Sequence, residues 1–310
     1  MGTPVEHRLH ASASPAIRPW HVIAAALTVL AAPALFVFED LPAGILLLIL
    51  GLAAAAYADR GGCGGQCSIP IPRGAADRAA LRALPPEARP PSLLRDLSLI
   101  ALGLAIIRTI DLGARLDTWS MVQFTLALGG AVLVPYLVSR FLYRDRATGF
   151  PWRSRQRWGV FHWAWLAAVL VLGWLILPWY FISSGVYENW PAVTTPDLIS
   201  RLFVGVGAVG IWDELFFICT VFAVLLRHFP AWLANVLQAV VFVSFLWELG
   251  YRSWGPLLTI PFALMQGMIF LRTRSLAYVV TVHLLFDAVV FAVLVHAHNP
   301  GLLDVFLTAP

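Results

Sequence analysis

The chain has 310 residues, of which 60% are hydrophobic and only 12% are charged. The charged fraction is about half that of an ordinary soluble domain, which excludes a typical soluble globular protein and predicts a polytopic membrane protein. The formal net charge of +4 comes without a basic tract of the kind that binds nucleic acid, so no nucleic-acid partner is expected.

Long apolar runs separated by short charged stretches predict an all-α transmembrane bundle of about nine spans. The first run follows a polar start with no clear small-residue cleavage site, so we expect it to remain as a span. The expected spans are residues 21–38, 41–57, 97–114, 121–143, 158–182, 199–226, 232–249, 256–271 and 276–296.

The placement of arginine predicts the orientation of these spans. Arginine-rich stretches lie at 59–95 and 140–157, whereas the loop 185–197 carries two acidic residues and no basic one. Because cytoplasmic loops are enriched in Lys and Arg, we expect the N-terminus inside, the C-terminus outside and a location in the cytoplasmic (plasma) membrane, among its lipids. We divide the chain into N-terminal transmembrane helices with Arg/Pro-rich cytoplasmic loops, 1–157, and a transmembrane helical core, 158–310.

Two cysteines, Cys63 and Cys67, lie in a glycine-rich stretch with the spacing Cys-x-x-x-Cys. A zinc site needs two further ligands at suitable spacing, and the neighbouring sequence supplies none. We therefore expect a flexible loop with reduced cysteines.

Two adjacent carboxylates, Asp213 and Glu214, interrupt the apolar run 202–226. An acidic residue at such depth costs roughly 2.5–3.5 kcal/mol on insertion scales, so the pair predicts a functional interior site. With a rise of about 1.5 Å per residue, the pair shares a depth with His283 and Asp287, which are four residues apart on one helical face. A buried layer of carboxylates and an imidazole indicates acid/base chemistry, a proton relay or a metal site.

We expect most other polar residues on the apolar helices to have structural rather than catalytic roles. Arg108 and Asp111 are three residues apart and are expected to pair on one face of the third span. His162 and Gln238 are expected to be packed or hydrogen-bonded positions. Glu248 lies near the outer end of its span, a turn or more above the acidic layer.

The order of polar residues on successive helices resembles the CPBP family of intramembrane proteases, which includes the CAAX prenyl endopeptidases and bacteriocin-processing or immunity proteins. Its motif Glu-Glu-x-x-x-Arg is matched in position by residues 213–218, and Phe-x-x-x-His by residues 242–246. Its motif His-x-x-x-Asn/Asp is matched fully by residues 283–287, and Gly267 stands where a family glycine does. The resemblance covers roughly residues 198–294.

The resemblance implies an endopeptidase that acts on membrane-embedded or lipidated peptides. Carried over by position, Asp213 is the general base and Glu214 is its partner. His283 and Asp287 bind the water or the oxyanion. A carboxylate beside another carboxylate in a dry site suits a general base, and a donor aimed at the developing oxyanion is worth about 3 to 4 kcal/mol.

The chain departs from the family pattern at three positions. Asp213 replaces the first glutamate, Ile218 replaces the arginine, and Leu246 replaces the histidine of the second motif, unless a shifted register places Glu248 there. These departures support an alternative hypothesis, in which the protein is a catalytically inactive family member that acts as a scaffold, chaperone or immunity-type subunit of a membrane complex. A small-molecule or proton transporter is a third hypothesis.

A metal site is a further alternative. If its helix is drawn inward, Glu248 becomes an additional site residue and completes a carboxylate-rich cage suited to a divalent metal. No other cofactor is expected. The members of that cage are Asp213, Glu214, Glu248, His283 and Asp287.

Overall fold

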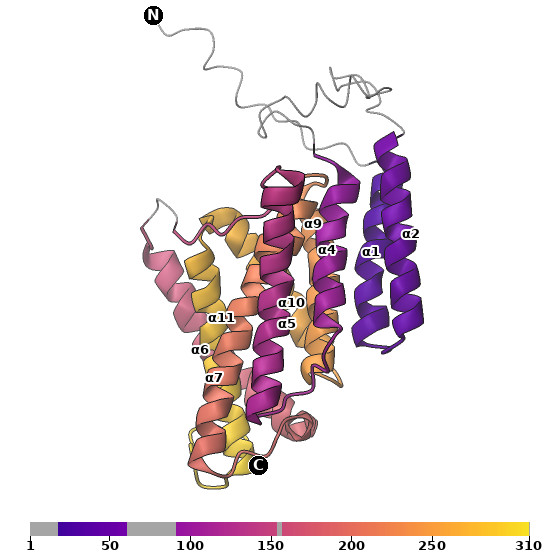
Figure 1. The fold of residues 1–310 in the computed structure, drawn as a ribbon. Coiled ribbons are helices and arrows are strands. Elements are labelled where there is room, and N and C mark those ends of the chain that lie inside the picture. Colours follow the sequence, from indigo (N-terminus) through magenta and orange to yellow (C-terminus); the bar gives the residue numbers. More distant parts are fainter. Residues whose placement is uncertain (1–17, 61–90, 154–156, 310) are drawn as a thin grey trace, which may run out of the picture.

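The computed structural model describes residues 18–60, 91–153 and 157–309, and within them it contains helices and no strand (Figure 1). The expected all-α class is confirmed. Two of the helices continue without a break: α5 into η3 (Val138–Tyr143), and α7 through η5 (Glu214–Phe222) into α8 (Ala223–Leu225). The long helices are α1 (Pro19–Phe36), α2 (Leu41–Arg60), α4 (Leu93–Ile107), α5 (Thr118–Leu137), α6 (Val160–Ser183), α7 (Pro196–Asp213), α9 (Ala231–Leu249), α10 (Pro256–Thr273) and α11 (Leu276–His298).

Eight helices of the described part are long and apolar enough to cross a membrane. The exception is α4, whose 15 residues span roughly 22 Å at 1.5 Å each, less than the roughly 30 Å of hydrocarbon. The third expected span, 97–114, was therefore wrong at both ends. Ser92 caps α4 by accepting a hydrogen bond from the Arg95 amide, and beyond Ile107 the chain leaves the helix for a turn in which Asp111 Oδ1 accepts from the Gly113 amide at 2.9 Å.

The first described helix begins at one end of the bundle and α11 finishes at the other (Figure 1). Which end faces the cytoplasm stays a prediction. Most of the arginine-rich stretch 59–95, together with Cys63 and Cys67, lies outside the described residues.

The segment η5 forms the centre of the bundle, where it packs against α4, α5, α9, α10 and α11. All of its residues are buried. On its α4 side, Gly103 allows the aromatic ring of Phe216 to approach the α4 backbone, because a Cβ at position 103 would lie only 2.2 Å from a ring carbon. The acidic pair thus sits at the start of the most enclosed segment.

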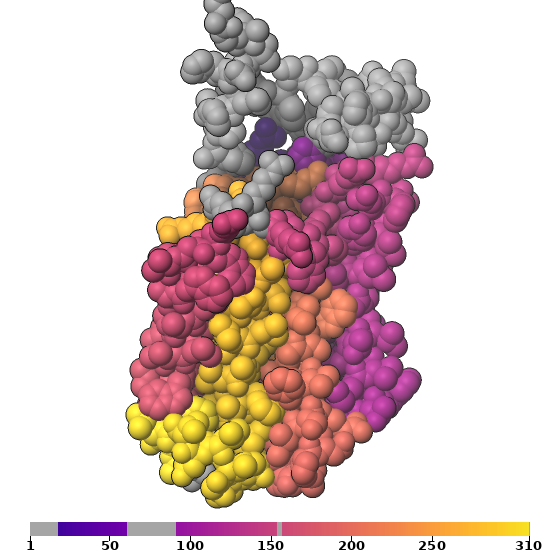
Figure 2. Space-filling model, turned by 90° about the vertical axis from the view of Figure 1, so that its left-hand side faces the viewer, coloured from indigo at the N-terminus to yellow at the C-terminus, as the bar shows by residue number. Residues whose placement is uncertain are grey.

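The remaining helices flank this centre. The hairpin of α1 and α2 packs on α9 and α4, while α6 packs on α11 on the other side. Figure 2 shows α6, α11, α7 and α5 side by side on one face of the molecule.

An ionic cluster joins three segments at the end of the bundle where α4 begins. The buried Asp96 carboxylate of α4 accepts from Arg227 Nη1 and lies against His228 Nε2, both at 2.7 Å. Arg227 Nη1 also lies 3.5 Å from Asp145 Oδ2, beyond η3. A buried carboxylate with such partners avoids the penalty of an unpaired charge.

Candidate active site

The acidic pair lies where the backbone changes from α-helix to π-helix, between Asp213 and Glu214. Short π-helical insertions inside α-helices occur frequently at functional sites. Both side chains are buried, with 2% of each residue exposed. They have different surroundings, because Asp213 lines a pocket whereas Glu214 is enclosed by hydrogen-bond donors.

Glu214 is the acceptor for two donors from two helices. Its Oε1 atom lies 2.7 Å from His283 Nδ1 of α11 and 2.7 Å from Gln266 Nε2 of α10. Gln266 Nε2 also lies 3.3 Å from the Val279 carbonyl oxygen, which fixes the amide. Glu214 therefore sets the orientation of the imidazole, as a carboxylate commonly does for a functional histidine.

The other imidazole nitrogen faces Asp287 one turn along α11. His283 Nε2 and Asp287 Oδ1 are 3.8 Å apart, which is too long for a direct hydrogen bond. Gly210 of α7 makes room for this pair, since a Cβ there would lie 2.1 Å from Asp287 Oδ2 and 3.4 Å from His283 Cδ2.

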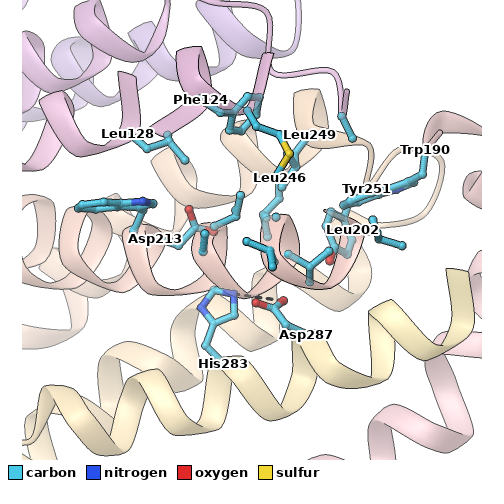
Figure 3. A pocket seen from close by; sticks show the side chains of 18 of the residues that line it. Phe124, Leu128, Trp190, Leu202, Asp213, Leu246, Leu249, Tyr251, His283 and Asp287 are labelled. Carbon is cyan, nitrogen blue, oxygen red and sulfur yellow. Dashed lines mark ion pairs between the residues drawn. The ribbon is translucent and has the colours of Figure 1, made fainter. Parts of the chain in front are cut away.

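Asp213, His283 and Asp287 line one pocket of about 120 Å³ (Figure 3). Most of its wall is apolar and comes from α5, α7 and the end of α9. Three lining residues are exposed, so the pocket reaches the surface of the molecule near α5, α7 and the loop before α5: Arg115, Thr125 and Val204.

Two carboxylate oxygens of the pocket residues, Asp213 Oδ2 and Asp287 Oδ2, are buried and make no hydrogen bond within the described residues. Buried polar atoms are nearly always paired. These oxygens therefore favour a site that binds a polar ligand rather than a packed core.

Glu248 lies apart from this group. Its Oε1 atom is 3.4 Å from Arg108 Nη1 and 3.4 Å from the Leu112 amide nitrogen. Arg108 therefore pairs with Glu248 and not with Asp111, whose partner is Arg115 at 3.3 Å. In the described part of the chain no three His, Cys, Asp or Glu side chains are grouped to hold a metal ion, so the five-residue cage is not assembled.

Sequence reasoning missed two residues of the site. Gln266 was an isolated amide on an apolar helix, and Tyr251 was placed in a loop, yet Tyr251 lines the pocket. The substituted position of the second motif is also informative, because Leu246 lines the pocket. The position of the first-motif arginine is occupied by Ile218, which is 2% exposed.

A comparison with protein families identifies one part of the chain. The family model described as "Type II CAAX prenyl endopeptidase Rce1-like" matches residues 195–289. These residues form an Rce1-like domain of the CPBP family. No match was found among curated proteins or among solved structures.

The Rce1-like domain begins at Thr195, the residue that caps α7, and ends within α11. It contains Asp213, Glu214, His283 and Asp287. The α5 wall of the pocket, which includes Phe124 and Leu128, lies outside it. Helix α5, the loop before it and Trp190, all of which precede the domain, therefore complete the pocket.

Proposed function

We propose that this protein is a CPBP-type intramembrane endopeptidase that hydrolyses membrane-embedded or lipidated peptides in the cytoplasmic membrane. The observation that carries the proposal is the pocket shared by Asp213, His283 and Asp287, whose lining includes exposed residues of α5 and α7. We expect a peptide held in the bilayer to approach these groups past the exposed residues of α5 and α7.

Asp213 has the position of a general base for water. The water oxygen bonds to the carbonyl carbon of the peptide while its proton passes to the Asp213 carboxylate. When the carbon–nitrogen bond breaks, the same proton passes to the leaving amine. The sequence of steps consumes one water and leaves a new carboxyl group and a new amino group.

His283 stabilises the oxyanion that forms in the first step. Its Nδ1–H is directed at Glu214, 2.7 Å away. A proton on Nε2 makes the ring an imidazolium, which the neighbouring carboxylates of Glu214 and Asp287 stabilise. The 3.8 Å gap to Asp287 Oδ1 leaves Nε2–H free to donate to the substrate oxygen.

The test uses purified protein in lipid vesicles and a panel of transmembrane peptides, with and without a lipid-modified cysteine, analysed by mass spectrometry. Wild type is expected to cut at one position. Asp213→Asn is expected to lose about 10²- to 10⁴-fold in rate, and His283→Ala about 10²- to 10³-fold. Asp197→Asn is the matched control, since the partner of this exposed carboxylate within the described residues is Arg201, at the surface. Cleavage that survives both site substitutions would defeat the proposal.

Two substituted positions favour a second candidate, a catalytically inactive scaffold or chaperone of a membrane complex. Leu246 brings no polar atom to the pocket at the family's histidine position, and the buried Ile218 brings no cation to the acidic pair. This candidate predicts that wild type and Asp213→Asn bind the same peptides and that neither cuts them.

A further inference from the structure

The hydroxyl of Tyr251 is a polar group of the pocket that has no role in the steps above. The other hydroxyls of the lining are engaged within their own segments, because Thr125 donates to the Met121 carbonyl and Thr259 to the Gly255 carbonyl. Tyr180, a second buried tyrosine nearby, donates to the Arg252 carbonyl at 2.7 Å. By contrast, the Tyr251 hydroxyl has no hydrogen bond to any described residue.

The backbone at the end of α9 directs Tyr251 to the pocket. Gly250 ends the helix with a φ of 131°, a conformation that side-chain-bearing residues rarely adopt. The chain then turns back, and the Tyr251 amide donates to the Leu246 carbonyl at 3.0 Å. The turn brings Tyr251 beside the helical turn of Leu246, which occupies the position of the family's histidine.

Packing holds the Tyr251 ring in place. Only 5% of the residue is exposed. Its ring meets Trp190 edge-on, with centroids 5.8 Å apart and planes at 89°, and meets Phe181 at 5.7 Å and 73°. Edge-to-face contacts of this kind are favourable and directional. The hydroxyl therefore reaches the pocket from a fixed ring (Figure 3).

The surroundings keep this hydroxyl protonated. Burial, followed by the negative charge of Asp287, raises the pKa of Tyr251 well above its usual range, and Asp213 acts in the same direction. A tyrosine whose pKa is raised keeps its proton at every pH up to and beyond its ordinary value of about 10. It is therefore a hydrogen-bond donor throughout the working range.

We propose that the Tyr251 hydroxyl donates a hydrogen bond to the carbonyl oxygen of the peptide bound in this pocket, beside His283 and in place of the histidine that Leu246 has replaced. The catalytic part of this inference rests on the proposed function. During hydrolysis the hydrogen bond from Tyr251 strengthens as the carbonyl oxygen becomes an oxyanion. In an inactive scaffold the same hydroxyl holds the peptide without cutting it.

The experiment compares Tyr251→Phe with wild type and with Tyr180→Phe in vesicles. Both variants keep the aromatic ring and remove one buried hydroxyl, but only the Tyr251 hydroxyl belongs to the pocket. The peptide that wild type binds most tightly in the panel, labelled with fluorescein, gives Kd, kcat and KM, and thermal unfolding reports folding.

For an active protein, Tyr251→Phe is expected to lower kcat about 10²-fold while KM changes by less than about 5-fold. Tyr180→Phe keeps the wild-type kcat. If wild type cuts the peptide and Tyr251→Phe cuts it equally fast, the inference is wrong and the proposed function stands.

If wild type binds the peptide without cutting it, the proposed function is wrong and binding decides the inference. A Kd raised about 5-fold by Tyr251→Phe and unchanged by Tyr180→Phe then supports the donor role. An unchanged Kd in both variants rules it out.

Discussion

His283 Nδ1 of α11 lies 2.7 Å from Glu214 Oε1 of η5, and this contact links the last helix of the bundle to its central segment. Gln266 donates to the same oxygen at 2.7 Å, so side chains from two different helices converge on one carboxylate oxygen. The Nδ1 side of the imidazole is fixed by Glu214, and Nε2 faces the pocket.

The first prediction concerns this support. Gln266→Leu removes one donor from Glu214 and is expected to lower kcat about 10-fold, because a hydrogen bond to a charged group is worth about 1.5 to 3 kcal/mol. The matched control is Gln238→Leu, since this buried amide donates to Asn235 and to the Ala263 carbonyl, away from the site. Both variants are expected to lose stability in detergent unfolding, and only Gln266→Leu is expected to lose rate. Equal cleavage rates in the two variants would show that the hydrogen bond from Gln266 to Glu214 does not contribute to catalysis.

The second prediction concerns the crossing of α7 and α11. Gly210→Ala places a Cβ against Asp287 Oδ2 and close to His283, so it is expected to destabilise the protein by about 1 to 3 kcal/mol and to abolish cleavage. Gly207→Ala on the same helix meets only Leu284 Cδ2 at 4.0 Å. That control is expected to keep activity and to gain up to about 1 kcal/mol from helix propensity. Thermal unfolding and cleavage rates of both variants test the difference, and equal behaviour would contradict it.

The third prediction concerns Glu248, which the geometry separates from the site. Glu248→Gln weakens the pair with Arg108, whose side chain is 23% exposed, and is expected to cost about 1 kcal/mol of stability. The cleavage rate and the metal content by elemental analysis are expected to match wild type. A large loss of rate together with a loss of bound metal would restore Glu248 to the site.

The fourth prediction concerns the ionic cluster around Asp96. Asp96→Ala leaves His228 without its buried carboxylate and leaves Arg227 with only the longer contact to Asp145 at 3.5 Å. Breaking a buried pair in this way costs about 3 to 5 kcal/mol. Asp111→Ala is the control, because its pair with Arg115 is exposed on both sides and such pairs are worth about 0 to 1 kcal/mol. Detergent unfolding curves measure both. Similar losses in the two variants would show that the cluster contributes little.

Much of the bundle and part of the site follow from the sequence, because hydropathy and depth depend on local residues. The apolar runs placed the long helices, and the rise per residue placed Asp213 and Glu214 at the depth of His283 and Asp287. The third span was misplaced because Arg108 and Asp111 were assumed to continue a helix. In the structure Arg108 instead meets Glu248, 140 residues away.

The other omissions have the same physical origin. Gln266 and Tyr251 carry no local pattern that separates them from packed residues, and their roles depend on which helix crosses next to them. Asp96 and Arg227 are 131 residues apart in the sequence. Nothing in the sequence around either residue indicates that the other is its partner. Pairing across helices is a property of the packed bundle, not of any single run.

The most direct test of the central claim is the initial rate of peptide cleavage by wild type and by Asp213→Asn in the same vesicles, at equal amounts of folded protein. The account predicts a cut at one peptide bond by wild type and a rate at least about 10²-fold lower for the variant. Equal rates for the two proteins would contradict it.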